Sequence, residues 1–300
     1  MRIAMVGLGD IARKAYLPIV AAHGDITPMI CTRDAGVLGQ VQRQYRIGGI
    51  YDDLDQVIVA RPDLAMVHTS TESHYGIVKR LLHAGIPVFV DKPISYHYGE
   101  TAELIELAAQ KQLPLMVGFN RRFAPLYQPF LKAPIRQVHY QKNRLNLPAK
   151  AREFILDDFI HVLDFVRFCT PVEPGDLQIF SHSKGGLLTS IQVQWQCGQA
   201  LFVAAMNRQQ GRNEERLRYM SENEHWEINN LSEGCHYKDG KLEQVGFNDW
   251  QPTLEKRGFV AIIDNMLKVI STGQGGDNYE DILATHKLCE DLIEHIEKMT

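Results

Sequence analysis

The sequence predicts an α/β protein with a doubly wound parallel sheet in its first part and an α+β second part with a large, mostly antiparallel open sheet. Two patterns carry this prediction. Up to about residue 119, short apolar strands alternate with helical segments, which is typical of βαβ units. Beyond it, strands that alternate polar with apolar residues follow one another. A chain of 300 residues is long enough for two such domains, which we place at residues 1–119 and 120–300.

The composition excludes several function classes. The chain is 45% hydrophobic and 23% charged, with a net charge of -4 and a pI near 6.3, so no basic excess favours nucleic acid or an anionic membrane. No segment reaches the ~18 apolar residues of a membrane helix, and the first apolar run is too short for a signal peptide. The five cysteines are widely spaced, without a C-x-x-C pair, which indicates neither a disulfide framework nor a zinc site. We expect a cytoplasmic protein with a small-molecule substrate.

A strand, a glycine turn and a helix open the chain. The apolar run 2–6 leads into Gly-Leu-Gly-Asp-Ile-Ala at 7–12, and a helical period follows to about residue 22. In a dinucleotide fingerprint Gly7 would allow the turn, Gly9 would let the pyrophosphate approach the backbone, and Ala12 would pack the helix on the sheet. The predicted cofactor contacts here are Gly7, Gly9, Asp10, Ile11 and Ala12; the alternative is an empty structural turn.

The second strand indicates which cofactor is preferred. It covers about 27–32 and ends in Cys31-Thr32-Arg33, where an NAD-binding site usually carries an acid for the ribose 2′-hydroxyl. A hydroxyl and a guanidinium at Thr32 and Arg33 would instead bind a 2′-phosphate. We therefore expect NADP(H) rather than NAD(H), with a solvated Arg33 as the alternative.

Three further strands of the first domain are expected to end at the same edge of the sheet. They cover about 63–70, 86–92 and 114–119, with helices over about 54–60, 75–84 and 98–110, and residues 71–74 as a polar loop. Because proline cannot continue a ladder and keeps the preceding residue extended, Lys92 before Pro93 should point out of the sheet. Ligands bind at this edge of an open parallel sheet. The predicted site residues here are Thr69, Ser70, His74, Asp91, Lys92 and Asn120. For His74 a helix cap is the alternative, and for the residues around Lys92 a solvated turn.

The second domain contains one helix with unusual chemistry. Its strands are expected at about 137–142, 177–182, 189–195, 200–205 and 225–229, with closing helices at 257–271 and 280–298. Between the first two strands, an amphipathic helix carries Asp157 four residues before His161 and Asp164 three residues after it, so all three should share a face. A carboxylate beside an imidazole suits a general acid/base. Zinc binding and a solvated charged face are the alternatives.

Taken in this order, the motifs resemble the Gfo/Idh/MocA family of glucose-fructose oxidoreductase and inositol 2-dehydrogenase. The resemblance rests on residues 7–12, 91–93, 117–123 and 157–164, and residues 250–259 make it most similar to the MviM branch. It implies an N-terminal Rossmann domain and NAD(P)-dependent oxidation or reduction of sugars, cyclitols or related compounds. It also implies a C-terminal domain that binds substrate and forms a homodimer or higher homo-oligomer through its sheet.

The resemblance assigns catalytic roles to Lys92, Asp157 and His161. His161 would take the proton of a substrate hydroxyl as hydride leaves, Asp157 would orient the imidazole, and a cationic Lys92 would stabilise the alkoxide. Two positions depart from the family: Asp91 replaces the commoner glutamate, and Phe159 replaces a glycine. Arg121, Arg122, Lys256 and Arg257 are candidate donors to an anionic substrate group, or else ordinary ion pairs. The alternative functions are a non-catalytic dinucleotide-binding regulator or scaffold and a redox-assisted lyase or glycosidase.

Overall fold

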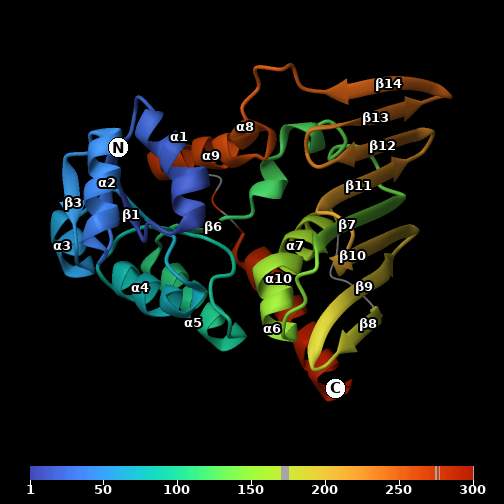
Figure 1. The fold of residues 1–300 in the computed structure, drawn as a ribbon, viewed down its shortest axis with the longest axis horizontal. Helices are drawn as coiled ribbons and strands as arrows, with labels where there is room; N and C mark the ends of the chain where they lie inside the picture. Colours follow the sequence, from blue (N-terminus) through green and yellow to red (C-terminus); the bar gives the residue numbers. More distant parts are fainter. Residues whose placement is uncertain (170–175, 274–275, 277, 300) are drawn as a thin grey trace. The chain divides into compact units, whose positions relative to one another are not determined.

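The computed structural model describes residues 1–169, 176–273, 276 and 278–299 (Figure 1). The chain forms two compact units: Met1–Gly118 with Phe259–Leu283, and Phe119–Gly258 with the residues from Ala284 onward. A single cut at residue 119 did not anticipate that 259–283 joins the first unit. The reason is packing, because helix α9 (Phe259–Thr272) lies against α1 (Leu17–Ala22), and the ring of Phe259 is 5.2 Å from that of Tyr16.

The first unit contains a six-stranded parallel sheet, which confirms that part of the predicted fold. Its strand order is β3-β2-β1-β4-β5-β6. Strands β4, β5 and β6 are apolar and fully buried along their length, as expected where helices cover a parallel sheet. The strands are β1 (Arg2–Val6), β2 (Thr27–Cys31), β3 (Gly49–Tyr51), β4 (Leu64–Val67), β5 (Val88–Val90) and β6 (Leu115–Val117).

The helices of this unit differ from expectation in two places. Helix α4 (Thr71–His83) begins four residues before the predicted start, so the prediction of a polar loop at 71–74 was wrong. Extended Ser70 holds the N-cap position and its carbonyl accepts from the Ser73 amide at 2.9 Å, so short polar residues form the first turn. Helix α2 (Ala35–Tyr45) was not predicted, although Asp34 caps it by accepting from the Val37 amide. The remaining helical segments are η1 (Ala12–Tyr16), α3 (Leu54–Ala60) and α5 (Tyr98–Lys111).

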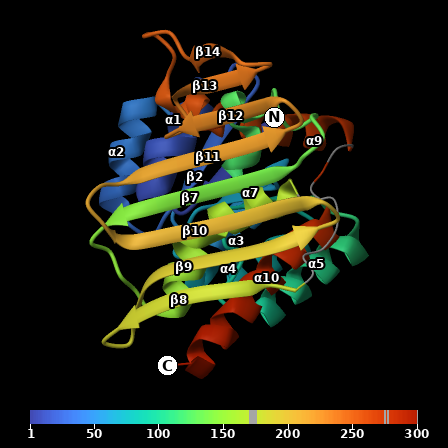
Figure 2. The ribbon, with the colours of Figure 1, turned by 90° about the vertical axis from the view of Figure 1, so that its right-hand side faces the viewer.

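The second unit is built on an eight-stranded sheet, seen face-on in Figure 2. Its strand order is β14-β13-β12-β11-β7-β10-β9-β8, and every neighbouring pair is antiparallel except β7 with β10. This confirms the predicted mostly antiparallel sheet, although β11, β13 and β14 were missed. The strands are β7 (Gln137–Leu145), β8 (Gln178–Lys184), β9 (Leu187–Cys197), β10 (Ala200–Gln210), β11 (Glu214–Ser221), β12 (Glu224–Asn229), β13 (Glu233–Lys238) and β14 (Lys241–Gly246).

A helical layer covers one face of this sheet. Helices α6 (Ala151–Phe154), η4 (Ile155–Phe159) and α7 (Ile160–Phe168) follow one another without a break, and α7 packs on β7 and β10. Phe165 on α7 lies 4.7 Å from the ring of Tyr127 and 5.5 Å from that of Tyr140. Because side chains alternate along a strand, Val138, Tyr140 and Lys142 of β7 all face this layer. The other helical segments are η2 (Asn120–Phe123), η3 (Pro125–Tyr127), α8 (Thr253–Lys256) and α10 (Tyr279–Met299).

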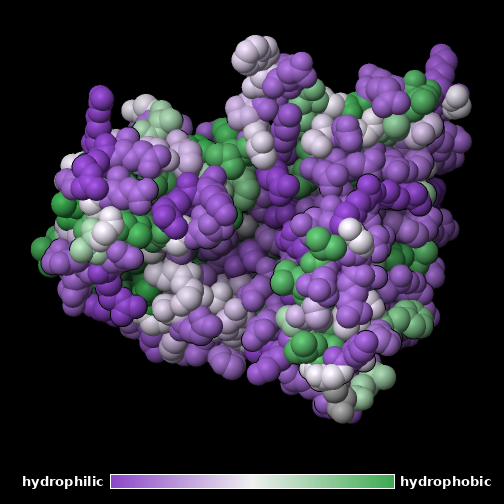
Figure 3. All heavy atoms as spheres, in the orientation of Figure 1, coloured by the Kyte–Doolittle hydropathy of each residue, from purple (hydrophilic) through white to green (hydrophobic). Residues whose placement is uncertain are grey.

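The visible surface is largely hydrophilic (Figure 3). Figure 3 shows hydrophilic side chains over most of the visible surface, with hydrophobic ones scattered among them. Among the described residues, no helix is long and apolar enough to span a bilayer, and no cluster of His, Cys, Asp or Glu is arranged to hold a metal ion. All five cysteines are unpaired.

Candidate active site

The glycine turn after β1 has the shape that a pyrophosphate requires. Gly7 has φ +89°, and a Cβ there would lie 2.6 Å from the Thr69 amide nitrogen, so only glycine fits. At Gly9 a Cβ would meet nothing closer than the His68 carbonyl at 3.6 Å. No described residue therefore excludes a side chain at Gly9, and its bare, exposed backbone leaves room for a ligand. The residues of this turn fit a dinucleotide.

The residues that follow Gly9 start a helix. Residues 10–22 are continuously helical, so unpaired amide groups of the first turn lie beside the glycines. The carboxylate of Asp10 is paired with Lys14 at 2.8 Å, Ile11 is 39% exposed, and Ala12 is buried. Of the three, Ala12 has the packing role that the sequence predicted.

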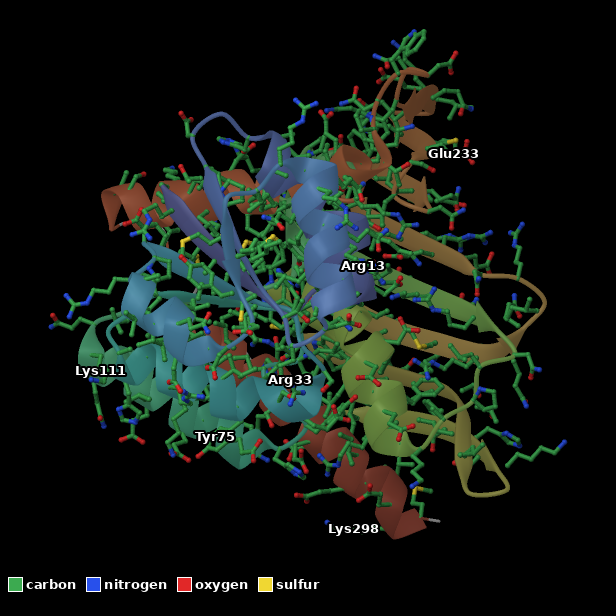
Figure 4. All side chains as sticks on the ribbon, turned by 60° about the vertical axis from the view of Figure 1, so that its left-hand side comes forward. Arg13, Arg33, Tyr75, Lys111, Glu233 and Lys298 are labelled. Atoms are coloured by element: carbon green, nitrogen blue, oxygen red, sulfur yellow. The ribbon has the colours of Figure 1, made fainter. Side chains whose placement is uncertain are left out.

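The end of β2 presents an exposed cation. The Thr32 hydroxyl accepts from the Asp34 amide at 3.4 Å, and Arg33 is exposed, just beyond the carboxyl end of β2 (Figure 4). In the described part of the chain Arg33 has no ion-pair partner. A guanidinium placed in this way is available to a phosphate.

The strand end at Lys92 is held by its neighbours. The Asp91 amide donates to the Val67 carbonyl at 3.0 Å, and the Asp91 carboxylate accepts from the Lys92 amide at 2.9 Å. A Cβ at Gly118 would come within 2.9 Å of that carboxylate, so Asp91 packs against bare backbone. Lys92 is half-buried, and the Lys92–Pro93 peptide bond is cis. Asp91 therefore contributes to holding the backbone that carries Lys92.

The predicted ligand role of His74 is not supported. Its side chain is 1% exposed, with Nδ1 2.9 Å from the Pro93 carbonyl oxygen and Nε2 3.1 Å from the Thr69 carbonyl oxygen. Both ring nitrogens are occupied by backbone, so His74 ties the Lys92–Pro93 turn to the start of α4. Thr69 is half-buried and Ser70 exposed at the same edge of the sheet.

The side chain of Asn120 likewise forms hydrogen bonds with other protein groups. It lies in the second unit and is 1% exposed. Its side-chain nitrogen donates to the Arg257 carbonyl at 2.7 Å, and its side-chain oxygen accepts from Arg121 at 3.0 Å. These contacts make it a support for Arg121 and do not favour the predicted cofactor contact.

The sequence analysis missed His68, which follows β4. Its ring stacks on Tyr16 at 4.3 Å and is 2% exposed. Neither ring nitrogen has a hydrogen-bond partner among the described residues. Burial, followed by the nearby His74, lowers the pKa of His68 to about 3.

His68 should make the first unit sensitive to acid. The folded protein keeps the imidazole neutral, whereas the unfolded chain protonates it below its ordinary pKa of 6.5. The contribution of neutral His68 to the free energy of unfolding is therefore complete above pH 6.5. The free energy of unfolding should fall by roughly 1 kcal/mol per pH unit as the pH drops from 6.5 towards 3. Urea unfolding between pH 7 and 5 measures this slope, and His68→Phe should flatten it. An unchanged slope in the variant would refute the assignment.

The helix that carries the predicted acid/base residues contains a π-helical turn. This turn, η4 (Ile155–Phe159), lies directly before His161; such turns are frequent at functional sites. Asp157 is half-buried, while His161 is 9% exposed. The prediction of an amphipathic helix was wrong, since residues 160–167 are buried on every side. The third predicted acid, Asp164, forms an ion pair with Arg122 and accepts from Thr285 at 3.3 Å.

Arg121 contacts the imidazole of His161. Its Nη1 lies 3.3 Å from Nδ1 and 3.4 Å from Nε2. On its other side the guanidinium donates to both carboxylate oxygens of Glu215, each at 3.1 Å. Tyr140 also donates to Glu215. Burial would raise the pKa of Glu215, but Arg121 and Lys142 outweigh it and lower that pKa to about 2. Arg121 is thus fixed against His161 by a charged carboxylate.

A second ion cluster surrounds Asp158. Lys142 lies 2.5 Å from its carboxylate, Arg144 donates to both oxygens at 2.7 and 2.9 Å, and Arg208 donates at 3.2 Å. Burial would raise the pKa of Asp158, but these cations hold it well below its usual range. Burial, reinforced by Arg121, lowers the pKa of Lys142 to about 7.

The strand pattern held a signal for part of this cluster. Val138 and Tyr140 are apolar and show which face of β7 is buried. Lys142 and Arg144 occupy the next alternate positions and therefore lie on the same face. Glu215 had no such signal, because β11 was not predicted.

Family models match both halves of the chain. Residues 1–119 match an oxidoreductase family with an NAD-binding Rossmann fold, and residues 125–238 match a YceM-like C-terminal domain. The YceM protein of Salmonella typhimurium is 31% identical over 275 residues, which cover 87% of this chain and 86% of that protein. Inositol 2-dehydrogenase of Rhizobium meliloti is 28% identical over 141 residues, 44% of this chain and 40% of that protein.

Solved structures give the same result. A Gfo/Idh/MocA family oxidoreductase from Vibrio cholerae has a TM-score of 0.96 and 37% identity, covering 100% of this chain and 99% of that one. A dehydrogenase (MviM) from Clostridium difficile has a TM-score of 0.92 and 29% identity, covering 98% and 99% of the two chains.

Proposed function

Because the chain belongs to the Gfo/Idh/MocA family of NAD-binding oxidoreductases, we propose that it transfers a hydride between NAD(P) and a small hydroxyl or carbonyl compound. Relatives that act on inositol favour a sugar, cyclitol or derivative as the substrate. The observation that supports this most is the contact of Arg121 with His161. A guanidinium has only donors and keeps its charge, so a ring nitrogen that pairs with it acts as the acceptor, and the contact holds the imidazole in place.

In this proposal three side chains act on one substrate hydroxyl. His161 accepts the hydroxyl proton, and Asp157, one turn earlier on the same helix, steadies the imidazolium that results. Lys92 donates to the oxygen and stabilises its developing negative charge. The nicotinamide, when bound, supplies the hydride acceptor. In the reverse direction Lys92 polarises a carbonyl and His161 returns the proton.

The test requires only purified protein. Cofactor that co-purifies is identified by its absorbance and mass, and reduction of NAD(P) is followed at the absorbance of the reduced nicotinamide. The assay is run against polyols, cyclitols, sugar acids and sugar phosphates, and against carbonyl compounds in reverse. We expect turnover with at least one of these compounds. Tight cofactor binding without turnover on any of them would favour a dinucleotide-binding regulator.

We further propose that NADP(H) is the preferred cofactor, because Arg33 is an exposed cation at the end of β2. Arg33→Ala should raise KM for NADP roughly 10- to 100-fold, the loss of one charge-assisted hydrogen bond, and should leave KM for NAD nearly unchanged. Steady-state kinetics with both cofactors measures this, with the exposed Arg13→Ala (Figure 4) as the matched control. Tighter binding of NAD than of NADP by the unaltered protein would contradict the preference.

We also propose that two copies associate through the open face of the eight-stranded sheet. In Figure 2 this face carries no helix of its own unit. Exposed Phe180 and Leu201 pair with Gln192 and Gln196 of β9, which alternate with buried Val193 and Trp195 and so belong to this open face. Light scattering should give the molar mass of a dimer or a larger oligomer, and Leu201→Glu should shift that mass towards the monomer.

We propose a reducing, cytoplasmic location, which the unpaired cysteines favour.

A further inference from the structure

We propose that Lys142, Arg144 and Arg208 bind an acidic substituent of the substrate, a carboxylate or a phosphate. This inference rests on the proposed function, and it narrows the substrate from sugars and cyclitols in general to sugar acids or sugar phosphates. All three cations belong to the second unit, which also carries Asp157 and His161.

Three cations share one carboxylate at this place. Asp158 is contacted by Lys142 on one oxygen, by Arg208 on the other, and by Arg144 on both. A single carboxylate neutralises one of the three charges. The second buried acid, Glu215, already accepts from Nε and Nη2 of Arg121, so it compensates that arginine.

The wider cluster also has more positive than negative groups. Arg144 of β7, Glu215 of β11, Arg121 of η2 and Asp158 of η4 act directly on Lys142. Arg208 of β10 contacts Asp158, Tyr140 of β7 contacts Glu215, and His161 of α7 contacts Arg121. Asp157, next to Asp158 in the chain, adds a third carboxylate. With Lys142 protonated, four of these side chains are cations, against three carboxylates. Buried charge without a counter-charge is costly, so an incoming anion would stabilise the cluster.

Donor groups remain in this cluster. The described contacts of Lys142 use one carboxylate oxygen, whereas an ammonium has three donors. The Nε of Arg208 is buried and has no hydrogen-bond partner among the described residues, while its guanidinium lies 4.6 Å above the ring of Phe154. Arg144, with 34% of its side chain exposed, connects the cluster to solvent.

Binding of an anion at this site should change the protonation state of Lys142. Because the pKa of Lys142 is lowered to about 7, the lysine is partly neutral near pH 7.5. A bound carboxylate or phosphate would favour the charged ammonium. Anion binding should therefore take up protons from the buffer, which an ordinary surface anion site would not do.

Titration calorimetry with the full-length protein tests the proposal. The probes are gluconate for a carboxylate, glucitol 6-phosphate and inorganic phosphate for a phosphate, and glucitol as the neutral comparison, each measured at pH 7.5 in two buffers of different ionisation heat. We expect at least one acidic probe to bind more tightly than glucitol, with proton uptake. Lys142→Met should abolish the uptake and weaken binding roughly 10- to 100-fold, and Arg144→Gln should weaken binding by a similar factor.

The controls separate this inference from the proposed function. Arg212→Gln changes an exposed arginine that pairs with a neighbouring glutamate, and it should bind like the unaltered protein. If Lys142→Met does not fold, the partly exposed Arg144→Gln carries the test. Equal affinity for acidic and neutral probes, or variants that bind acids like the unaltered protein, would overturn the inference. Anion binding that depends on Lys142 but is followed by no hydride transfer would instead overturn the proposed function alone.

Discussion

His161→Ala is expected to lower turnover by roughly 10²- to 10⁴-fold, the contribution of a positioned general acid/base. The imidazole is 9% exposed and its ring nitrogens face Arg121, so neither water nor a neighbouring side chain easily replaces it as proton acceptor. Lys92→Met should cause a loss of similar size, because in the proposed mechanism it removes the cation that stabilises the alkoxide. Steady-state rates on the identified substrate measure both effects.

Matched exposed residues provide the controls for these two variants. His83 and Lys111 are exposed, at the end of α4 and of α5 (Lys111 is labelled in Figure 4). His83→Ala and Lys111→Met should keep nearly full turnover. Circular dichroism of each variant separates catalytic loss from unfolding. Near-full turnover of both His161→Ala and Lys92→Met would require a different catalytic assignment.

Glu215→Leu is expected to destabilise the second unit by about 3–5 kcal/mol, the typical cost of leaving one buried charge without its partner. Glu215 and Arg121 are each 7% exposed and joined by two hydrogen bonds. Turnover should fall as well, because Arg121 would no longer be fixed against His161. Urea unfolding at neutral pH measures the stability, and the pH profile of turnover reports on the imidazole.

A double replacement tests whether the stability lost in Glu215→Leu comes from the charge of Arg121 that is left without a partner. Glu215→Leu combined with Arg121→Met removes both charges, and the pair should recover much of the stability lost in the single variant. Glu222→Ala, which removes one partner of the exposed pair with Arg136, should change stability by no more than about 1 kcal/mol. If Glu215→Leu were as mild as Glu222→Ala, Arg121 would not depend on its carboxylate.

Acid should weaken the same ion pair. The pKa of Glu215 is lowered from 4.5 to about 2 in the folded protein. Its stabilising contribution is therefore complete above pH 4.5 and is lost as the pH falls from 4.5 through 2. Between pH 4.5 and 2 the free energy of unfolding should depend less steeply on pH in the variant that combines Glu215→Leu with Arg121→Met than in the unaltered protein.

Local sequence patterns were sufficient for the first sheet and its glycine turn. Strands β1, β4, β5 and β6 are short apolar runs that stay apolar because both faces are buried, and the turn at Gly7 depends on a backbone conformation that glycine adopts without strain. Strand β5 is also present before Pro93, although it ends at Val90, two residues before the end predicted at Lys92. All of these features depend on residues close together in the chain, so a local pattern records them.

The environment of His161 could not be predicted in this way. The helical spacing of Asp157, His161 and Asp164 indicated one charged face. In the tertiary fold, however, α7 is buried and Asp164 forms an ion pair with Arg122. Similarly, His74 was expected near a ligand and is occupied by two backbone carbonyls. A buried polar group needs partners, and the sequence around it does not say which distant residues supply them.

The sequence alone thus established the fold class, the dinucleotide turn, and Lys92 and His161 as the residues to test. Only the tertiary structure revealed that Arg121, 40 residues before His161, and Glu215, 94 residues after Arg121, meet beside that imidazole. It also brought Lys142, Arg144 and Arg208 to one carboxylate. The physical reason is that charges are paired across strands and helices whose register is set by long-range packing, which no local periodicity encodes.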